Sequence, residues 1–229
     1  MKLKFGIGLA AVLFTSLAFG AGDAFTFKSS QKEGDVLKYK QVAKLDFQGM
    51  PIEFSASSTR KVIKIDASGN VTVKEDVSDA KLNGADAPEG SGPGATTVTS
   101  TAKGEVVKIE GDRVDENAYR MANLELFIAP DKPVNAGDTW SYDIKENKTT
   151  GAVNAKANYT FVGDEKIGDI DAVKVKIAVK ESGDSGASTE GFIWLRKSDC
   201  VMVKMTSKWN NVPIGPGGIS GDVTVTLAQ

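Results

Sequence analysis

The chain has 229 residues, of which 41% are hydrophobic and 25% are charged, and its formal net charge is −2. These values are typical of a globular protein and exclude disordered and fibrous classes. The chain has no histidine and a single cysteine, Cys200. Histidine-dependent catalytic triads, imidazole-bound zinc and an internal disulfide are therefore excluded, and we expect no cofactor and no metal site.

The N-terminus has the pattern of an export signal. Two lysines precede an apolar run from Phe5 to Phe19, and Ala18 and Gly20 supply the small residues that an export peptidase accepts. The run has about 15 residues, fewer than the roughly 20 that span a bilayer, which favours cleavage over a retained membrane anchor. We therefore expect a signal peptide at 1–20, a mature β domain at 21–229 without a transmembrane span, and a periplasmic or extracellular location in a bacterium.

Alternation of apolar and polar residues dominates the mature sequence. Between Val173 and Lys180, four apolar residues point to one side of the expected strand and three lysines point to the other, and segment 37–47 repeats the pattern. Such strands have one buried face and one hydrated face. Short intervals rich in Gly, Asn and Asp separate the strands, which favours antiparallel hairpins over crossover helices. Further strands are expected at 61–66, 70–77, 105–110, 192–196, 201–206 and 223–227.

Two stretches depart from this alternation. Residues 83–103 are rich in glycine and proline and predict a mobile loop. In 115–128, Asp115 is a candidate cap for a short helix that Pro130 would end, while a strand in the second half is the alternative. The predicted fold is a mainly β domain, an antiparallel curled sheet or half-barrel with one short helix. A closed eight-stranded barrel is the alternative.

A short motif occurs twice in the chain. Gly34-Asp35 and Gly137-Asp138 are each followed by a variable residue, a bulky apolar residue, a spacer and a tyrosine, and each opens an expected strand. The recurrence indicates two similar β halves, 34–128 and 137–229. Chance recurrence in a chain rich in glycine and aspartate is the competing explanation.

The segment around the second motif resembles uncharacterised exported bacterial all-β proteins. Pro130-Asp131-Lys132-Pro133-Val134-Asn135-Ala136-Gly137-Asp138-Thr139-Trp140 matches their proline-valine run before Gly-Asp-Thr-Trp, and Gly191-Phe192-Ile193-Trp194 matches their Gly-x-x-Trp hairpin. Where that family has an Asp-Gly turn next, this chain has Asp199-Cys200. More remotely, the chain is similar to the lipoprotein-carrier class. The resemblance implies an exported protein whose curled antiparallel sheet cups a lipid chain.

Aromatic residues are the candidate ligand-binding residues. Trp140, Trp194, Trp209 and Tyr142 lie on or near expected strands and predict a stacking platform for a sugar or a lipid chain. Aromatic side chains at strand positions also pack in cores, which is the alternative.

Catalytic interpretations have little chemical support. Gly183-Asp184-Ser185-Gly186 copies the sequence around the nucleophile of trypsin-like proteases, but the chain has no histidine to take the serine proton. Asp35 and Asp138 are the best placed carboxylate pair for acid–base hydrolysis. The competing interpretation is that each of these carboxylates bonds the backbone of its own turn. No catalytic residue is therefore assigned.

The sequence favours an exported, non-catalytic binding module with an apolar or lipid-like ligand. The alternatives are a structural or interaction protein of the cell envelope, with an envelope protein as its partner, and a carboxylate-dependent hydrolase. Basic and acidic residues are interspersed, so no nucleic-acid partner is expected.

Overall fold

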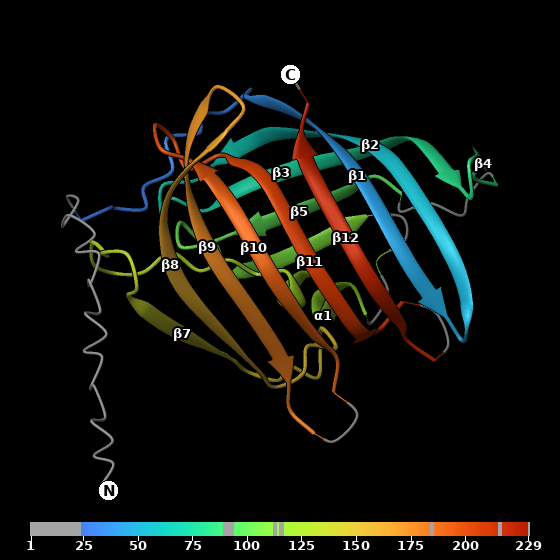
Figure 1. The fold of residues 1–229 in the computed structure, drawn as a ribbon. Helices are drawn as coiled ribbons and strands as arrows, with labels where there is room; N and C mark the ends of the chain where they lie inside the picture. Colours follow the sequence, from blue (N-terminus) through green and yellow to red (C-terminus); the bar gives the residue numbers. More distant parts are fainter. Residues whose placement is uncertain are drawn as a thin grey trace, which may run out of the picture.

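The computed structural model describes residues 24–88, 94–111, 114, 117–183, 186–214 and 217–228, so the expected signal peptide at 1–20 lies outside the described residues. The described residues form one antiparallel sheet and one short helix (Figure 1). The elements are α1 Ala118–Leu124 and the strands β1 Val36–Phe47, β2 Met50–Ile65, β3 Val71–Leu82, β4 Ala85–Asp86, β5 Thr96–Ser100, β6 Val106–Gly111, β7 Thr139–Ile144, β8 Ala155–Ile167, β9 Ile170–Glu181, β10 Ser188–Arg196, β11 Met202–Val212 and β12 Ile219–Leu227.

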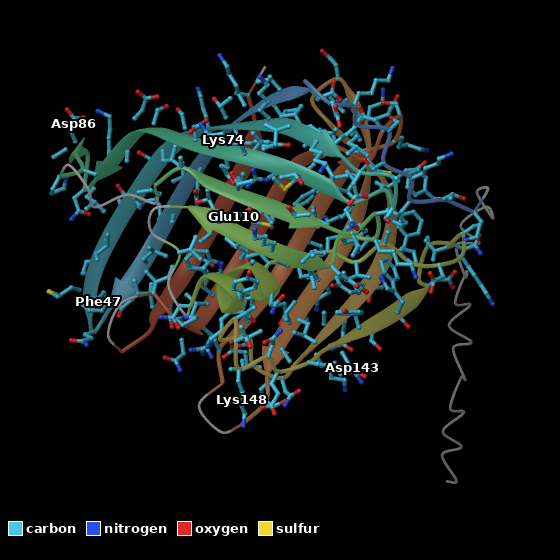
Figure 2. The ribbon with its side chains drawn as sticks, turned by 180° about the vertical axis from the view of Figure 1, so that it is seen from behind. Phe47, Lys74, Asp86, Glu110, Asp143 and Lys148 are labelled. Atoms are coloured by element: carbon cyan, nitrogen blue, oxygen red, sulfur yellow. The ribbon has the colours of Figure 1, made fainter. Side chains whose placement is uncertain are left out.

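The sheet is curled but not closed. Neighbouring strands follow the order β6-β5-β3-β2-β1-β12-β11-β10-β9-β8-β7, and the short β4 pairs with β3 beside this path. The chain thus forms two meanders, β1–β6 and β7–β12, joined by the pairing of β1 with β12. The two ends of the sheet are β6, marked by Glu110 in Figure 2, and β7, marked by Asp143, and α1 lies between them. The predicted antiparallel curled sheet with one short helix is confirmed.

The predicted alternation sets the two faces of the sheet. In β9, Val173, Val175 and Val179 are at most 1% exposed on the concave side, while Lys176 and Lys180 are exposed on the convex side. A fully buried valine stabilises a fold by roughly 1.5–3 kcal/mol relative to an exposed one. The rows of concave valines therefore fix which face of each strand turns inward.

The repeated Gly-Asp motif forms the same turn before β1 and before β7. Gly34 and Gly137 have φ values of 92° and 94°, a left-handed conformation that glycine adopts without strain. Each carboxylate, of Asp35 and of Asp138, accepts a hydrogen bond at 2.7 Å from the backbone N–H three residues earlier. Each glycine N–H donates to the next strand at 2.8 Å. The two aspartates therefore close turns, as the structural interpretation of the motif predicts.

Two segments differ from the expectation. The segment 83–103, expected as one loop, contains β4 and β5, and β5 consists of β-branched residues and one serine, which favour strands. The helix expected within 115–128 is confined to α1, and residues 126–129 follow it as neither helix nor strand. Asp115, the candidate cap, lies outside the described residues. Leu126 and Ile128, which follow the helix, are both buried, whereas a continuing helix would place residues two apart on different sides.

Cys200 stands in the turn between β10 and β11. Its φ is 56°, in the left-handed region, and its N–H donates to the Arg196 carbonyl at 2.8 Å. The Asp199 carboxylate accepts a hydrogen bond from Val201 N at 3.1 Å and bonds the Arg196 guanidinium at 2.7 Å. These contacts stabilise a turn that would be unstrained with glycine at this position.

Candidate functional site

A segment of the chain crosses the concave side of the sheet. We call residues 124–129, which include the last residue of α1, the strap. Its carbonyl groups at alternate positions accept hydrogen bonds from side chains of three strands. Thr189 of β10 donates to the Leu124 carbonyl. Tyr159 of β8 donates to the Leu126 carbonyl at 2.8 Å, and Trp140 of β7 donates to the Ile128 carbonyl at 2.7 Å. A buried carbonyl without a partner costs about 1–3 kcal/mol, so these donors hold the strap in place. The strap therefore lies against β7, β8 and β10 on the concave side, where the resemblance places a ligand.

Aromatic rings enclose one end of the strap. Phe127 of the strap packs edge-on against Tyr159 and Trp140, with ring centroids 5.7 Å and 6.3 Å apart, and Trp140 stacks on Tyr159 at 5.3 Å. Phe25 and Phe27, which precede β1, join this cluster, with Phe27 at 5.4 Å from Phe127 and 5.9 Å from Trp140. The protein's own aromatic rings thus fill this part of the concave side.

The strap itself carries an acidic side chain, Glu125. Glu125 Oε1 accepts a hydrogen bond from Trp209 Nε1 of β11 at 3.1 Å. Burial raises the pKa of Glu125 to about 7, against the lowering effects of the Arg60 charge and the Trp209 N–H. Arg60 Nε lies 3.1 Å from Glu75 Oε1, and its guanidinium lies 4.9 Å from the ring centroid of Tyr39. The sheet interior therefore contains a network of charged and aromatic groups from β1, β2, β3 and β11.

The space next to Glu125 is small. The void that this residue lines, together with Leu124 and Thr189, has a volume of 10 Å³. About one water molecule needs that much space, so a substrate does not fit there.

A larger opening lies at the seam, by which we mean the space between the unpaired edges of β6 and β7. The seam cleft has a volume of 220 Å³ and is lined by residues of both edges, of α1, of the strap and of the loop after β7. Leu126 and Ile144 are 5% and 6% exposed and form its most buried walls. The remaining lining residues are Val106, Val107, Tyr119, Tyr142 and Ala152 together with the polar Glu105, Asn123, Lys145, Asn147 and Thr150.

Polar groups also border the seam cleft. Tyr119 Oη accepts a hydrogen bond from Ile109 N at 3.0 Å, which satisfies one amide on the open edge of β6. Burial raises the pKa of Tyr142, and the neighbouring carboxylate of Glu105 raises it further. Lys145, in the loop after β7, is exposed at the margin of the cleft. The cleft thus has buried apolar walls at Leu126 and Ile144 among a lining that is otherwise largely polar.

The four aromatic residues predicted to bind a ligand do not lie together. Trp140 and Tyr142 share the concave side of β7, where Tyr142 lines the seam cleft and Trp140 borders a separate surface hollow of 480 Å³. Trp209 faces the strap from β11. Trp194 is 5% exposed on the convex side, where two lysine ammonium groups lie 4.9 Å and 5.0 Å from its ring. The structure therefore forms no single platform from these residues.

The sequence does not predict most of the cleft. Val106, Tyr119 and Leu126 come from segments far from Tyr142 in the chain, and no motif links them. The one local signal is the spacing of Leu124, Leu126 and Ile128, which indicates an extended apolar segment after the helix.

Two features are absent from the part of the chain that the structure describes: a membrane-crossing helix and a cluster of metal ligands. None of its helices is both long enough and apolar enough to cross a membrane. No group of three or more acidic or cysteine side chains lies together as metal ligands would. The protease-like tetrapeptide 183–186 falls partly outside the described residues.

Comparison with solved structures finds similarity to an exported bacterial protein. No protein-family model matches the chain, and no curated protein matches it significantly. A Bacteroides fragilis protein, described as exported and as having a YmcC-like fold, is similar to this chain with a TM-score of 0.39 and 18% sequence identity. The match covers 89% of this chain and 97% of that protein. Because this likeness is low, the functional proposal below rests on the geometry of the chain itself.

Proposed function

We propose that the protein is an exported, non-catalytic binding module that takes the end of an apolar molecule, such as an acyl chain, into the seam cleft. The cleft carries this proposal, because its 220 Å³ lies between two unpaired strand edges and has buried apolar walls at Leu126 and Ile144. Pockets that enclose a drug-sized ligand have roughly 300–1,000 Å³. We infer that only one end of the ligand enters.

The polar margin of the cleft suits an amphiphilic ligand. Lys145 is exposed there, and Tyr119 and Tyr142 also line the cleft. Ligand sites commonly combine an apolar lining with a few polar groups that fix the orientation of the ligand. A tail in the cleft and a polar head beside Lys145 would satisfy both parts of the site.

The chemistry of the described residues supports binding over catalysis. Asp35 and Asp138 each bond the backbone of their own turn. The void beside Glu125 is too small for a substrate. The proposal of export rests on the basic, apolar and small-residue pattern of residues 1–20.

Native mass spectrometry of the protein purified from its own envelope tests this proposal. Wild type is expected to carry a bound amphiphile that dissociates on activation. Ala152→Trp places an indole in the cleft and should release the bound molecule. Val162→Trp, at a position that is 46% exposed on β8 and outside the cleft, is the matched control and should retain it. Equal occupancy in the two variants, or an unoccupied wild type, would contradict the proposal.

A protein–protein interaction at the same edges is the second candidate function. The edges of β6 and β7 are unpaired within the sheet, and Val107 of β6 is 51% exposed. Such edges pair readily with a strand of another chain. Light scattering during size-exclusion chromatography should then show an oligomer for wild type and a monomer for Val107→Lys. Monomers in both samples would remove self-association.

A further inference from the structure

The convex side of the sheet carries more positive than negative charge. Six adjacent strands form this side: β9, β10, β11, β12, β1 and β2. Away from bulges, every second residue of these strands points to the convex side, and the residues between them point to the concave core. We call this surface, which Figure 1 shows in front of α1, the convex lysine face. Its lysines come from β1, β2, β9 and β11: Lys38, Lys40, Lys44, Lys61, Lys174, Lys176, Lys180, Lys204 and Lys208. Its acidic residues are fewer: Asp46, Glu53, Glu190 and Asp222.

This excess of positive charge contrasts with the whole chain, whose formal net charge is −2. The acids of the chain are therefore concentrated elsewhere, and the molecule has a polarised charge distribution. A surface of this kind orients a protein toward an anionic partner before contact.

A cross-strand row runs through the centre of the convex lysine face. The strand pairing places Lys40, Thr226, Lys204, Trp194 and Lys174 side by side on five neighbouring strands. Strands in a sheet lie about 4.8 Å apart, so the row is roughly 19 Å long. Three lysines and a threonine of this row surround the buried Trp194.

Several of these lysines have no acid to neutralise them. Lys174 and Lys176 form ion pairs with Glu165 and Glu190 at 3.0 Å and 2.6 Å. Within the described ranges, no acidic oxygen lies within 4.0 Å of the ammonium groups of five other lysines of this face, Lys38, Lys40, Lys61, Lys204 and Lys208. Lys208 has Glu190 and Asp222 as its cross-strand neighbours, and the Lys204 ammonium lies over the Trp194 ring. Lys38, Lys40 and Lys61 are therefore the lysines of this face that are most available to phosphate.

Exposed apolar side chains lie among the lysines and indicate the kind of partner. Val36 and Val42 of β1 are 51% and 48% exposed and alternate with Lys38, Lys40 and Lys44 on the convex side. An anionic bilayer offers phosphates to the lysines and the boundary of the acyl region to the valines. A soluble polyanion would leave the valines without a partner.

We propose that the convex lysine face docks on the surface of a bilayer that contains anionic phospholipids. This face lies on the opposite side of the sheet from the strap and does not depend on ligand binding in the seam cleft. Each lysine near an anionic surface strengthens attachment about fivefold, and the effect weakens as salt screens the charges.

Sedimentation of the full chain with phosphatidylglycerol vesicles tests the docking surface, with phosphatidylcholine vesicles as the neutral reference. Wild type should sediment only with the anionic vesicles, and less so as the salt concentration rises. The double variant Lys38→Glu, Lys40→Glu should lose at least about tenfold in apparent affinity. The matched control Lys132→Glu, Lys148→Glu makes the same change of charge at exposed positions outside this face and should bind like wild type.

Three results would overturn the proposal. Wild type that stays in the supernatant with anionic vesicles shows that the face does not bind a bilayer. An equal loss in the two double variants shows that net charge, and not this face, governs binding. Retention by a soluble polyanion such as dextran sulfate, without vesicle binding, assigns the face to a polymer.

Discussion

Replacing Tyr159 by phenylalanine tests how the strap is held. Tyr159 is 1% exposed, and its hydroxyl donates to the Leu126 carbonyl at 2.8 Å. The change removes one oxygen atom and leaves the ring stacked on Trp140 and packed against Phe127. Only the bond between β8 and the strap is lost.

The expected loss follows from the burial of both partners. A typical hydrogen bond contributes about 0.5–1.5 kcal/mol to stability, and a buried carbonyl left without a donor raises the loss to about 1–3 kcal/mol. Because the ring remains, no large cavity adds to this value. We therefore expect the free energy of unfolding of Tyr159→Phe to fall by about 1–3 kcal/mol.

Urea denaturation followed by circular dichroism measures this change, and the denaturant slope should stay the same. Tyr142→Phe is the control, because Tyr142 is only half-buried at the seam cleft and water can satisfy its neighbours. A loss below about 0.5 kcal/mol for Tyr159→Phe, or equal losses for the two variants, would refute the role of this bond in holding the strap.

Three further variants test separate parts of the structure. Burial raises the pKa of Glu125 from 4.5 to about 7. The free energy of unfolding of wild type should therefore fall by up to about 3 kcal/mol as the pH rises through this window. In urea titrations, the free energy of unfolding of Glu125→Gln should depend less on pH. Gly191→Ala would place a Cβ 1.8 Å from the Thr206 carbonyl oxygen. Thermal unfolding should therefore show that the variant loses more than about 3 kcal/mol of stability. Stability like that of wild type would contradict the close approach of β10 and β11. Cys200→Gly relieves a left-handed φ of 56° and should gain up to about 1 kcal/mol in urea, whereas a loss would show that the cysteine side chain stabilises the turn.

The faces of the strands could be predicted because alternation is a local property. Val173, Val175 and Val179 are buried and their lysine neighbours are exposed, as the two-residue period of β9 predicts. The turns at Asp35 and Asp138 were also within reach, since aspartate after glycine favours a bond to its own backbone.

The strap could not be predicted, because its stability depends on distant donors. The hydroxyl of Thr189 and the indole N–H of Trp140 bond carbonyl groups, which every residue has and which therefore leave no mark in the sequence. Trp140 and Trp209, which are ligand-binding candidates from the sequence, each donate an indole N–H to the strap. The burial of Leu126 follows from this tertiary contact.

The charge of the convex face also depends on topology. In the sequence, lysines and acids are interspersed, and this pattern predicted no basic surface. The pairing of β1 with β12 brings Lys40 next to the row that contains Lys204 and Lys174, although these strands are far apart in the chain. Charge clustering of this kind becomes visible only when the order of the strands is known.

Paramagnetic broadening by a spin-labelled fatty acid tests the seam cleft most directly. With the label near the end of the acyl chain, amide signals of Val106, Leu126 and Ile144, which line the cleft, should broaden first in spectra of the isotopically labelled protein. Signals of Val42 and Thr224 on the convex side should remain sharp. Broadening centred on the convex strands, or none at all, would contradict ligand binding between β6 and β7.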